Sequence, residues 1–86
     1  MLIADPASLA LRIRDIRASK GISQDELAAR ARCNRKTIIA LEKGENSQTH
    51  TLLRVLLALG MALDIVDNQV DLNYLDSLVE PYDGSN

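Results

Sequence analysis

The spacing of apolar positions near the N-terminus predicts a helix over about residues 6–20. Asp5 followed by a proline is a typical helix start, because Asp caps free backbone N–H groups and proline fits the first helical position. Gly21 provides a stop signal. Between these signals, apolar residues recur at helical spacing, at Leu9, Ile13 and Ile16.

A capping box predicts a second helix that runs to about Ala31. In Ser23-Gln-Asp-Glu26, the Ser23 hydroxyl can accept a hydrogen bond from the Glu26 N–H, and the Glu26 carboxylate can accept one from the Ser23 N–H. Leu27, Ala28 and Ala31 then share one face, which we interpret as the side that packs on the core.

Asn34 begins a third predicted helix, over about residues 35–43. Asn is a favoured N-cap, and Gly44 suits the left-handed backbone that closes many helices. Ile38 and Leu41 lie on one face of this helix, so we assign them to packing and give them no function.

A polar loop over residues 45–48 separates this element from a fourth predicted helix, from Thr51 to Leu59. Gly60 follows its last apolar residue and ends it. Four leucines mark its apolar surface, at Leu52, Leu53, Leu56 and Leu59.

The pattern changes after Gly60, where a period of two predicts a short strand over about residues 61–66. Met61, Leu63 and Ile65 alternate with Ala62 and Asp64. A lone strand cannot satisfy its backbone groups, so we expect it to pair with its own copy in a twofold dimer. The predicted dimer interface consists of Leu57, Met61, Leu63 and Ile65.

These elements predict a mainly α fold, a four-to-five-helix bundle with a short C-terminal β-strand that pairs across a dimer. We place the folded domain at residues 1–67 and an acidic, partly disordered tail at 68–86. Apolar residues in this tail, at Leu72, Leu75, Leu78 and Val79, indicate a short helix that orders on a protein partner, and the alternative is a frayed terminus of no consequence. A single domain of 86 residues also favours an oligomer, since its core is small.

Charge is strongly segregated along the chain, although its sum is only −2. All ten Lys and Arg residues lie between Arg12 and Arg54, so residues 1–59 carry a net charge of +4. Residues 60–86 hold six acids and no base, a net charge of −6. Such asymmetry indicates a basic nucleic-acid-binding body with an acidic appendage, and the alternative is an ordinary solvated surface.

Composition removes several classes of function. An aromatic content of 2% leaves few stacking platforms for single-stranded nucleic acid, whereas duplex grooves remain accessible. With one cysteine and one histidine, Cys33 and His50, we expect no disulfide, no metal site, no cofactor and no enzymatic constellation. Charges within the first 20 residues and the lack of an apolar run of about 18 residues predict a cytoplasmic protein with neither signal peptide nor membrane span.

The second and third predicted helices, with the turn between them, have the dimensions of a helix-turn-helix unit. Ser23 and Gln24 stand at a helix N-terminus, where free N–H groups attract phosphate, and Asn34 and Lys43 at the ends of the third helix complete the predicted phosphate-contacting set. The predicted base-contacting set on the outer face of the third helix is Arg35, Lys36, Ile39 and Ala40, with Arg35 suited to guanine and Ile39 to a thymine methyl. The alternative for the two basic residues is solubilising charge.

Three short motifs occur at fixed spacing: Ser-Gln-x-x-Leu-Ala from Ser23, Thr-Ile from Thr37, and Leu-Glu-x-Gly from Leu41. With them the chain resembles the Cro/repressor-type helix-turn-helix family, also called the XRE family, over about residues 9–60. The resemblance implies a structural ion pair between Arg17 and Glu42. The family usually has glycine in the turn, where this chain has Arg32, and a non-glycine residue at positive φ costs about 1 kcal/mol, so a rearranged turn stays open.

The segment from Leu59 to Asp67 resembles HipB-type antitoxins, in which a C-terminal strand closes the dimer. This resemblance implies a homodimer on a palindromic duplex operator. It further implies a repressor that is the antitoxin of a toxin–antitoxin operon, with a toxin such as a HipA-type kinase as its partner. The alternatives are a stand-alone or phage-type repressor without a toxin, and a protein-interaction module that has lost DNA binding.

Overall fold

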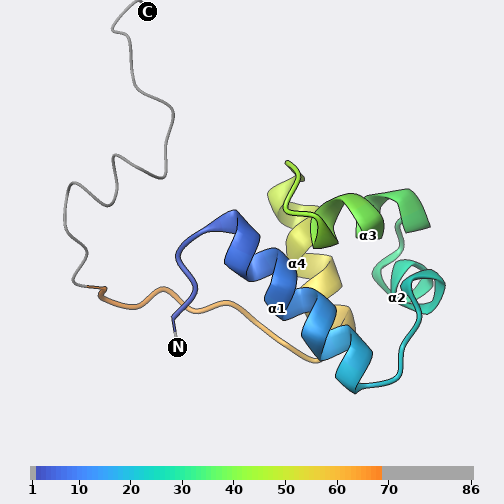
Figure 1. Cartoon of the computed structure of the whole chain (residues 1–86), viewed down its shortest axis with the longest axis horizontal. Helices are drawn as coiled ribbons and strands as arrows, with labels where there is room; N and C mark the ends of the chain where they lie inside the picture. The colour runs from blue at the N-terminus through green and yellow to red at the C-terminus, as the bar shows by residue number, and fades with distance from the viewer. Residues whose placement is uncertain (1, 69–86) are drawn as a thin grey trace, which may run out of the picture.

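The computed structural model describes residues 2–68, which form four α-helices (Figure 1). The helices are α1 (Pro6–Ser19), α2 (Gln24–Ala31), α3 (Arg35–Glu42) and α4 (Thr49–Ala58). The mainly α helix-turn-helix fold is therefore confirmed. The predicted ends agree with the structure to within one or two residues, and the largest difference is at α4, which begins at Thr49 after an extended Gln48.

Three of the predicted N-caps are present. The side chains of Asp5, Ser23 and Asn34 each accept a hydrogen bond from the backbone N–H three residues further on, at 2.8, 3.0 and 2.9 Å. The Ser8 N–H is the main reason that the pKa of Asp5 lies below its ordinary value. Only half of the capping box of α2 forms, because the Glu26 carboxylate lies 3.5 Å from Arg30 instead of returning to the Ser23 N–H.

The core lies between the four helices and contains the predicted inner faces of α2 and α3. Its buried members are Ala10, Ile13, Ile22, Leu27, Ala28, Ala31, Ile38, Leu41, Val55, Leu56 and Leu59. Leu53, one of the four leucines that mark the apolar surface of α4, is 40% exposed, and Leu57 one turn later is 69% exposed. Because α4 is apolar around most of its circumference, one stripe of it stays uncovered by any described part of this chain.

Residues 61–68 form neither a helix nor a strand within the single chain. The Met61 N–H donates to the Leu56 carbonyl at 2.8 Å, after which the segment runs back beside the N-terminal segment (Figure 1). Leu63 and Ile65 line one groove together with Ile3. A strand that pairs with its copy has no ladder in one chain. The paired strand therefore stays a prediction, and the predicted helix around Leu72 to Val79 lies outside the described residues.

Candidate nucleic-acid interface

The turn between α2 and α3 has the left-handed backbone conformation for which the family usually has a glycine. Arg32 is the C-cap of α2 and lies in the left-handed region, at φ 57° and ψ 47°. It is the one residue other than glycine with positive φ among residues 2–68. The turn is thus not rearranged, and the conformational strain of about 1 kcal/mol is confined to the backbone of one exposed residue.

An ion pair joins the helix-turn-helix to α1 and confirms the pairing that the family resemblance implied. Arg17 Nε lies 2.6 Å from Glu42 Oε2, and Arg17 Nη2 lies 3.0 Å from Oε1. The hydrogen bond to this carboxylate raises the pKa of the Arg17 guanidinium, although burial acts in the opposite direction. The same guanidinium donates to the Ile22 carbonyl at 2.9 Å, so α3 is held firmly against the end of α1.

Gln24, predicted to contact phosphate, has a partner within the protein. Its Nε2 lies 3.2 Å from Glu42 Oε1, and the side chain is half-buried. An amide nitrogen has two N–H donors, so the second one stays available to a ligand at the N-terminus of α2. Ser23 is exposed beside it, with its oxygen accepting the cap hydrogen bond and its hydroxyl proton free to donate.

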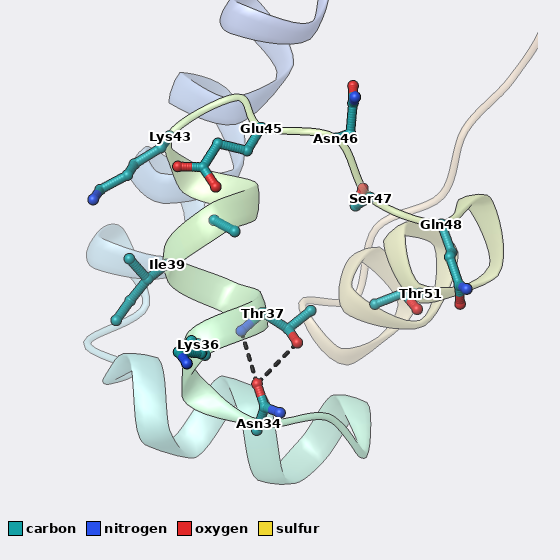
Figure 2. A pocket seen from close by; sticks show the side chains of 11 residues that line it. Asn34, Lys36, Thr37, Ile39, Lys43, Glu45, Asn46, Ser47, Gln48 and Thr51 are labelled. Carbon is teal, nitrogen blue, oxygen red and sulfur yellow. Dashed lines mark hydrogen bonds between the residues drawn. The ribbon is translucent and has the colours of Figure 1, made fainter.

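The outer face of α3 borders an open hollow of about 590 Å³ (Figure 2). Of the predicted DNA-contacting residues, five line it: Asn34, Lys36, Ile39, Ala40 and Lys43. The last four follow one another at spacings of three, one and three residues, which places them on a single stripe of the helix. Figure 2 shows the side chains of Lys36, Ile39 and Lys43 projecting from this stripe. The structure therefore brings two exposed cations and two half-buried apolar residues together on one face of α3.

The Asn34 side chain is divided between two roles. Its Oδ1 accepts from the backbone N–H and from the hydroxyl of Thr37, both at 2.9 Å (Figure 2). Its amide nitrogen is exposed at the rim of the hollow and is the atom that can donate to a phosphate.

The loop between α3 and α4 supplies lining residues that the sequence did not identify. Glu45, Asn46, Ser47 and Gln48 border the hollow together with Thr51, the second residue after the start of α4. The signal was the polar run 45–48, which predicted a loop but gave no reason for this loop to fold back beside α3. Glu45 adds an acid to a surface on which we predicted none.

Arg35, the predicted guanine-contacting residue, stands outside this hollow at the first position of α3. Its Nη1 lies 3.9 Å from the Oδ2 of Asp25 in α2, and both side chains are exposed. The sequence does not predict this contact, because the two residues are ten positions apart and the geometry of the turn decides whether they meet.

The predicted dimer residues are mostly uncovered within the described chain. Leu57, Leu63 and Ile65 are exposed, the last by 98%, while Met61 packs partly against the core. Leu63 and Ile65 also line an apolar groove of about 550 Å³ between the N-terminal segment, α1 and α4. The structure thus leaves an apolar surface open where we predicted the dimer interface.

No three His, Cys, Asp or Glu side chains of residues 2–68 gather closely enough to hold a metal ion. No helix in this range is long and apolar enough to cross a membrane. Cys33 is half-buried against the core, and this burial raises the pKa of its thiol, while His50 is exposed.

Solved structures of regulators share this fold. A HipB chain in complex with the O2 20mer matches with a TM-score of 0.76 and 26% identity, over 80% of this chain and 97% of that one. A chain of the HipA-HipB-O2-O3 complex also gives 0.76 and 26%, over 80% and 99%. The restriction-modification controller protein C.AhdI from Aeromonas hydrophila gives 0.62 and 29%, over 66% and 84%.

A search of curated protein sequences gives no match. A model of the helix-turn-helix family, in contrast, matches residues 13–66, which include α2, the turn, α3 and the segment after α4. The motifs, the Arg17 to Glu42 pair and the exposed stripe of α3 all lie within this match. The chain therefore belongs to the XRE-type helix-turn-helix family and is a DNA-binding transcriptional regulator.

Proposed function

We propose that this regulator is a sequence-specific repressor that binds a palindromic duplex operator as a twofold dimer and serves as the antitoxin and autoregulator of a toxin–antitoxin operon. It acts by binding, without catalysis. The observation that carries the proposal is the extent of the structural likeness. The match to HipB chains covers 80% of this chain and nearly all of theirs, whereas the match to C.AhdI covers 66%.

In the proposed complex, α3 enters the major groove with its exposed stripe toward the base edges. Arg35 and Lys36 donate to guanine acceptors, while Ile39 and Ala40 contact a thymine methyl. Each good base contact contributes about 1–3 kcal/mol of discrimination. The hollow beside α3 leaves room for one edge of the DNA groove, and the two lysines that line it, Lys36 and Lys43, supply a positive potential.

Phosphate contacts then fix the register of the domain on the duplex. The Ser23 hydroxyl and the second N–H of the half-buried Gln24 are the donors that we assign to phosphate at the N-terminus of α2, where the helix dipole favours an anion. In the proposed complex, Asn34 Nδ2 and Lys43, at the two ends of α3, approach phosphates of the DNA backbone. These contacts position the protein and carry no sequence information of their own.

Dimerisation follows in this proposal from the last turn of α4 and the residues after it. Leu57, Leu63 and Ile65 expose apolar side chains that no described part of the chain covers. Pairing residues 61–66 with the same segment of a second copy forms the missing ladder and covers this surface. Two recognition helices related by a twofold axis then read half-sites about one helical turn, roughly 34 Å, apart.

Two measurements test the proposal together. An electrophoretic shift series on the DNA upstream of the gene, with sizing of the complex, is expected to give two chains per site. Co-expression with the product of the neighbouring reading frame is expected to yield a stable complex and to suppress that product's toxicity. A persistent monomer on one half-site contradicts the dimer, and a neighbour that neither binds nor harms the cell contradicts the antitoxin assignment.

A stand-alone regulator is the second candidate. The likeness to C.AhdI, a controller protein of a restriction-modification system, favours it. It shares the operator binding and the dimer with the first candidate but requires no toxin. The identity of the neighbouring gene distinguishes the two candidates, since a kinase-like or ribonuclease-like neighbour is expected only for an antitoxin.

A further inference from the structure

We infer that Asp25 is a positioning residue for Arg35. The Asp25 carboxylate keeps the Arg35 guanidinium directed toward a guanine edge and away from the DNA phosphates. The inference rests on the proposed entry of α3 into the major groove. The observation behind it is a salt bridge, in which Arg35 Nη1 lies 3.9 Å from Asp25 Oδ2.

Backbone geometry brings the two residues together. Asp25 is the second residue of α2 and Arg35 is the first residue of α3, so the pair joins the N-terminal turns of two helices. The left-handed conformation of Arg32 sets the angle at which α3 leaves the turn. No other salt bridge to Asp25 or Arg35 forms within residues 2–68.

Exposure makes a purely stabilising role a poor account of this pair. The side chains of Arg35 and Asp25 are 59% and 73% exposed, and a pair this open to water contributes little to folding. Both charges instead lie at the surface that we place against DNA. There, desolvation by the duplex strengthens their interaction, because the effective dielectric constant falls.

The chemistry of the guanidinium explains how an acid can improve discrimination. Nη1 faces the carboxylate, which leaves Nη2 and Nε to donate to O6 and N7 of guanine. A phosphate bound to the same guanidinium would lie close to the Asp25 carboxylate, and the two anions repel one another. The neutral guanine edge meets a much smaller penalty, so Asp25 weakens the competing contact more than the specific one.

Asp25 has one other evident role, since an acid in the first turn of a helix interacts favourably with the helix dipole. That role predicts a change in stability with no change in sequence preference. The deciding measurement is therefore selectivity at the base pair that Arg35 reads, and that base pair is the one at which Arg35→Ala relaxes the preference.

The test compares Asp25→Asn with Asp15→Asn in the full chain. Asp15 is a matched control, because its carboxylate also lies 3.9 Å from an arginine, Arg14, and the side chains of Arg14 and Asp15 are 54% and 71% exposed. This second pair is on α1, outside the hollow. Fluorescence anisotropy measures binding to three duplexes over a range of salt. They are the operator selected from a random pool by the wild-type protein, its single-base variant at the Arg35 position, and a scrambled duplex.

For Asp25→Asn we expect the ratio of operator to variant affinity to fall about fivefold, the lower end for loss of a bidentate base contact. We expect the scrambled duplex to bind more tightly, with a salt slope steeper by about one per chain, since Arg35 then takes a phosphate. Asp25→Glu keeps an acid within reach and restores the ratio. Asp15→Asn leaves the ratio unchanged.

A double-mutant cycle with Arg35→Ala separates positioning from simple repulsion. In the Arg35→Ala background, Asp25→Asn should leave the ratio where it is, because the residue to be positioned is gone. If Asp25→Asn instead tightens all three duplexes by one factor in both backgrounds, Asp25 is only a repulsive surface charge and the inference is wrong. A lower melting temperature with an unchanged ratio overturns it equally. A wild-type protein that selects no operator contradicts the proposed function itself, which is a different result.

Discussion

Arg17 Nε in α1 lies 2.6 Å from Glu42 Oε2 in α3, and the two side chains are only 15% and 4% exposed. The carboxylate also accepts from Gln24 in α2, at 3.2 Å. One buried acid thus connects three helices, including both helices of the DNA-binding unit. Since no buried side-chain polar atom of the described residues lacks a hydrogen-bond partner, removing this acid leaves donors without an acceptor.

Glu42→Gln is expected to destabilise the fold strongly. The substitution removes the charge that balances the Arg17 guanidinium and leaves that cation largely buried, which costs about 3 kcal/mol or more. This is a large share of the stability of so small a domain. Urea denaturation followed by circular dichroism measures the loss.

Glu26→Gln is the matched control for this change. Glu26 also pairs with an arginine, Arg30, but at 3.5 Å with both side chains more than half exposed. An exposed pair of this kind contributes at most about 0.5 kcal/mol. Equal losses for the two variants would mean that the buried network does not hold α3 in place.

Arg32→Gly is expected to stabilise the protein. Arg32 lies at φ 57°, where a side chain is strained and glycine is not, so relief of this strain adds about 1 kcal/mol. The gain is somewhat reduced because glycine has more conformational freedom in the unfolded chain. The measurement is the midpoint of thermal and urea unfolding.

The same substitution two residues earlier should have the opposite sign. Arg30 lies in the last turn of α2 with ordinary helical geometry, and replacing a helical arginine by glycine costs about 1 kcal/mol. A destabilised Arg32→Gly variant would show that the Arg32 side chain makes interactions worth more than the strain.

Local signals were sufficient to predict the helices of this chain. Asp5, Ser23 and Asn34 cap the helices that their sequence context indicated, because a cap depends on atoms within three residues. The inner faces of α2 and α3 followed from periodicity for the same reason. Periodicity did not tell which stripe of the apolar α4 meets the core, where Leu56 and Leu59 are buried while Leu53 is 40% exposed.

Contacts between distant residues were much harder to predict. The Arg17 to Glu42 pair came from a family resemblance, whereas the Arg35 to Asp25 approach and the Glu45 side of the hollow came only from the structure. Each depends on how a turn or loop directs the next helix. The strand after Gly60 stays a prediction because its hydrogen-bond partners belong to a second chain.

Lys43→Ala is expected to weaken binding to specific and non-specific duplexes by the same factor. Lys43 lies at the C-terminal end of α3 as a point charge suited to phosphate, and loss of one phosphate contact lowers the salt slope by about one. Lys20→Ala is the control, since Lys20 caps α1 and does not line the hollow. A change in sequence preference for Lys43→Ala would move this residue from the phosphate set to the base set.

Ile65→Pro is expected to yield a monomer. Proline removes a backbone donor and bends the strand that we place at the dimer seam, where Ile65 itself is 98% exposed in the single chain. Sedimentation velocity measures the state, and a lower melting temperature should accompany dissociation. Asn68→Pro, beyond the predicted strand, should leave the dimer intact. An unchanged dimer in Ile65→Pro would place the seam elsewhere.

Deletion of residues 69–86 is expected to preserve or raise DNA affinity at moderate salt. This segment contains four of the six acids of residues 60–86 and no base, so phosphate repels it, and we expect its charge to screen the basic residues of the domain. Its apolar residues are more numerous than a purely solvating tail needs, so capture of the neighbouring gene product should weaken in the truncated chain. Anisotropy on the operator and co-purification with that product give the two readouts. Because the acids oppose a groove contact, a truncation that lowered DNA affinity without altering the helical content would contradict this assignment.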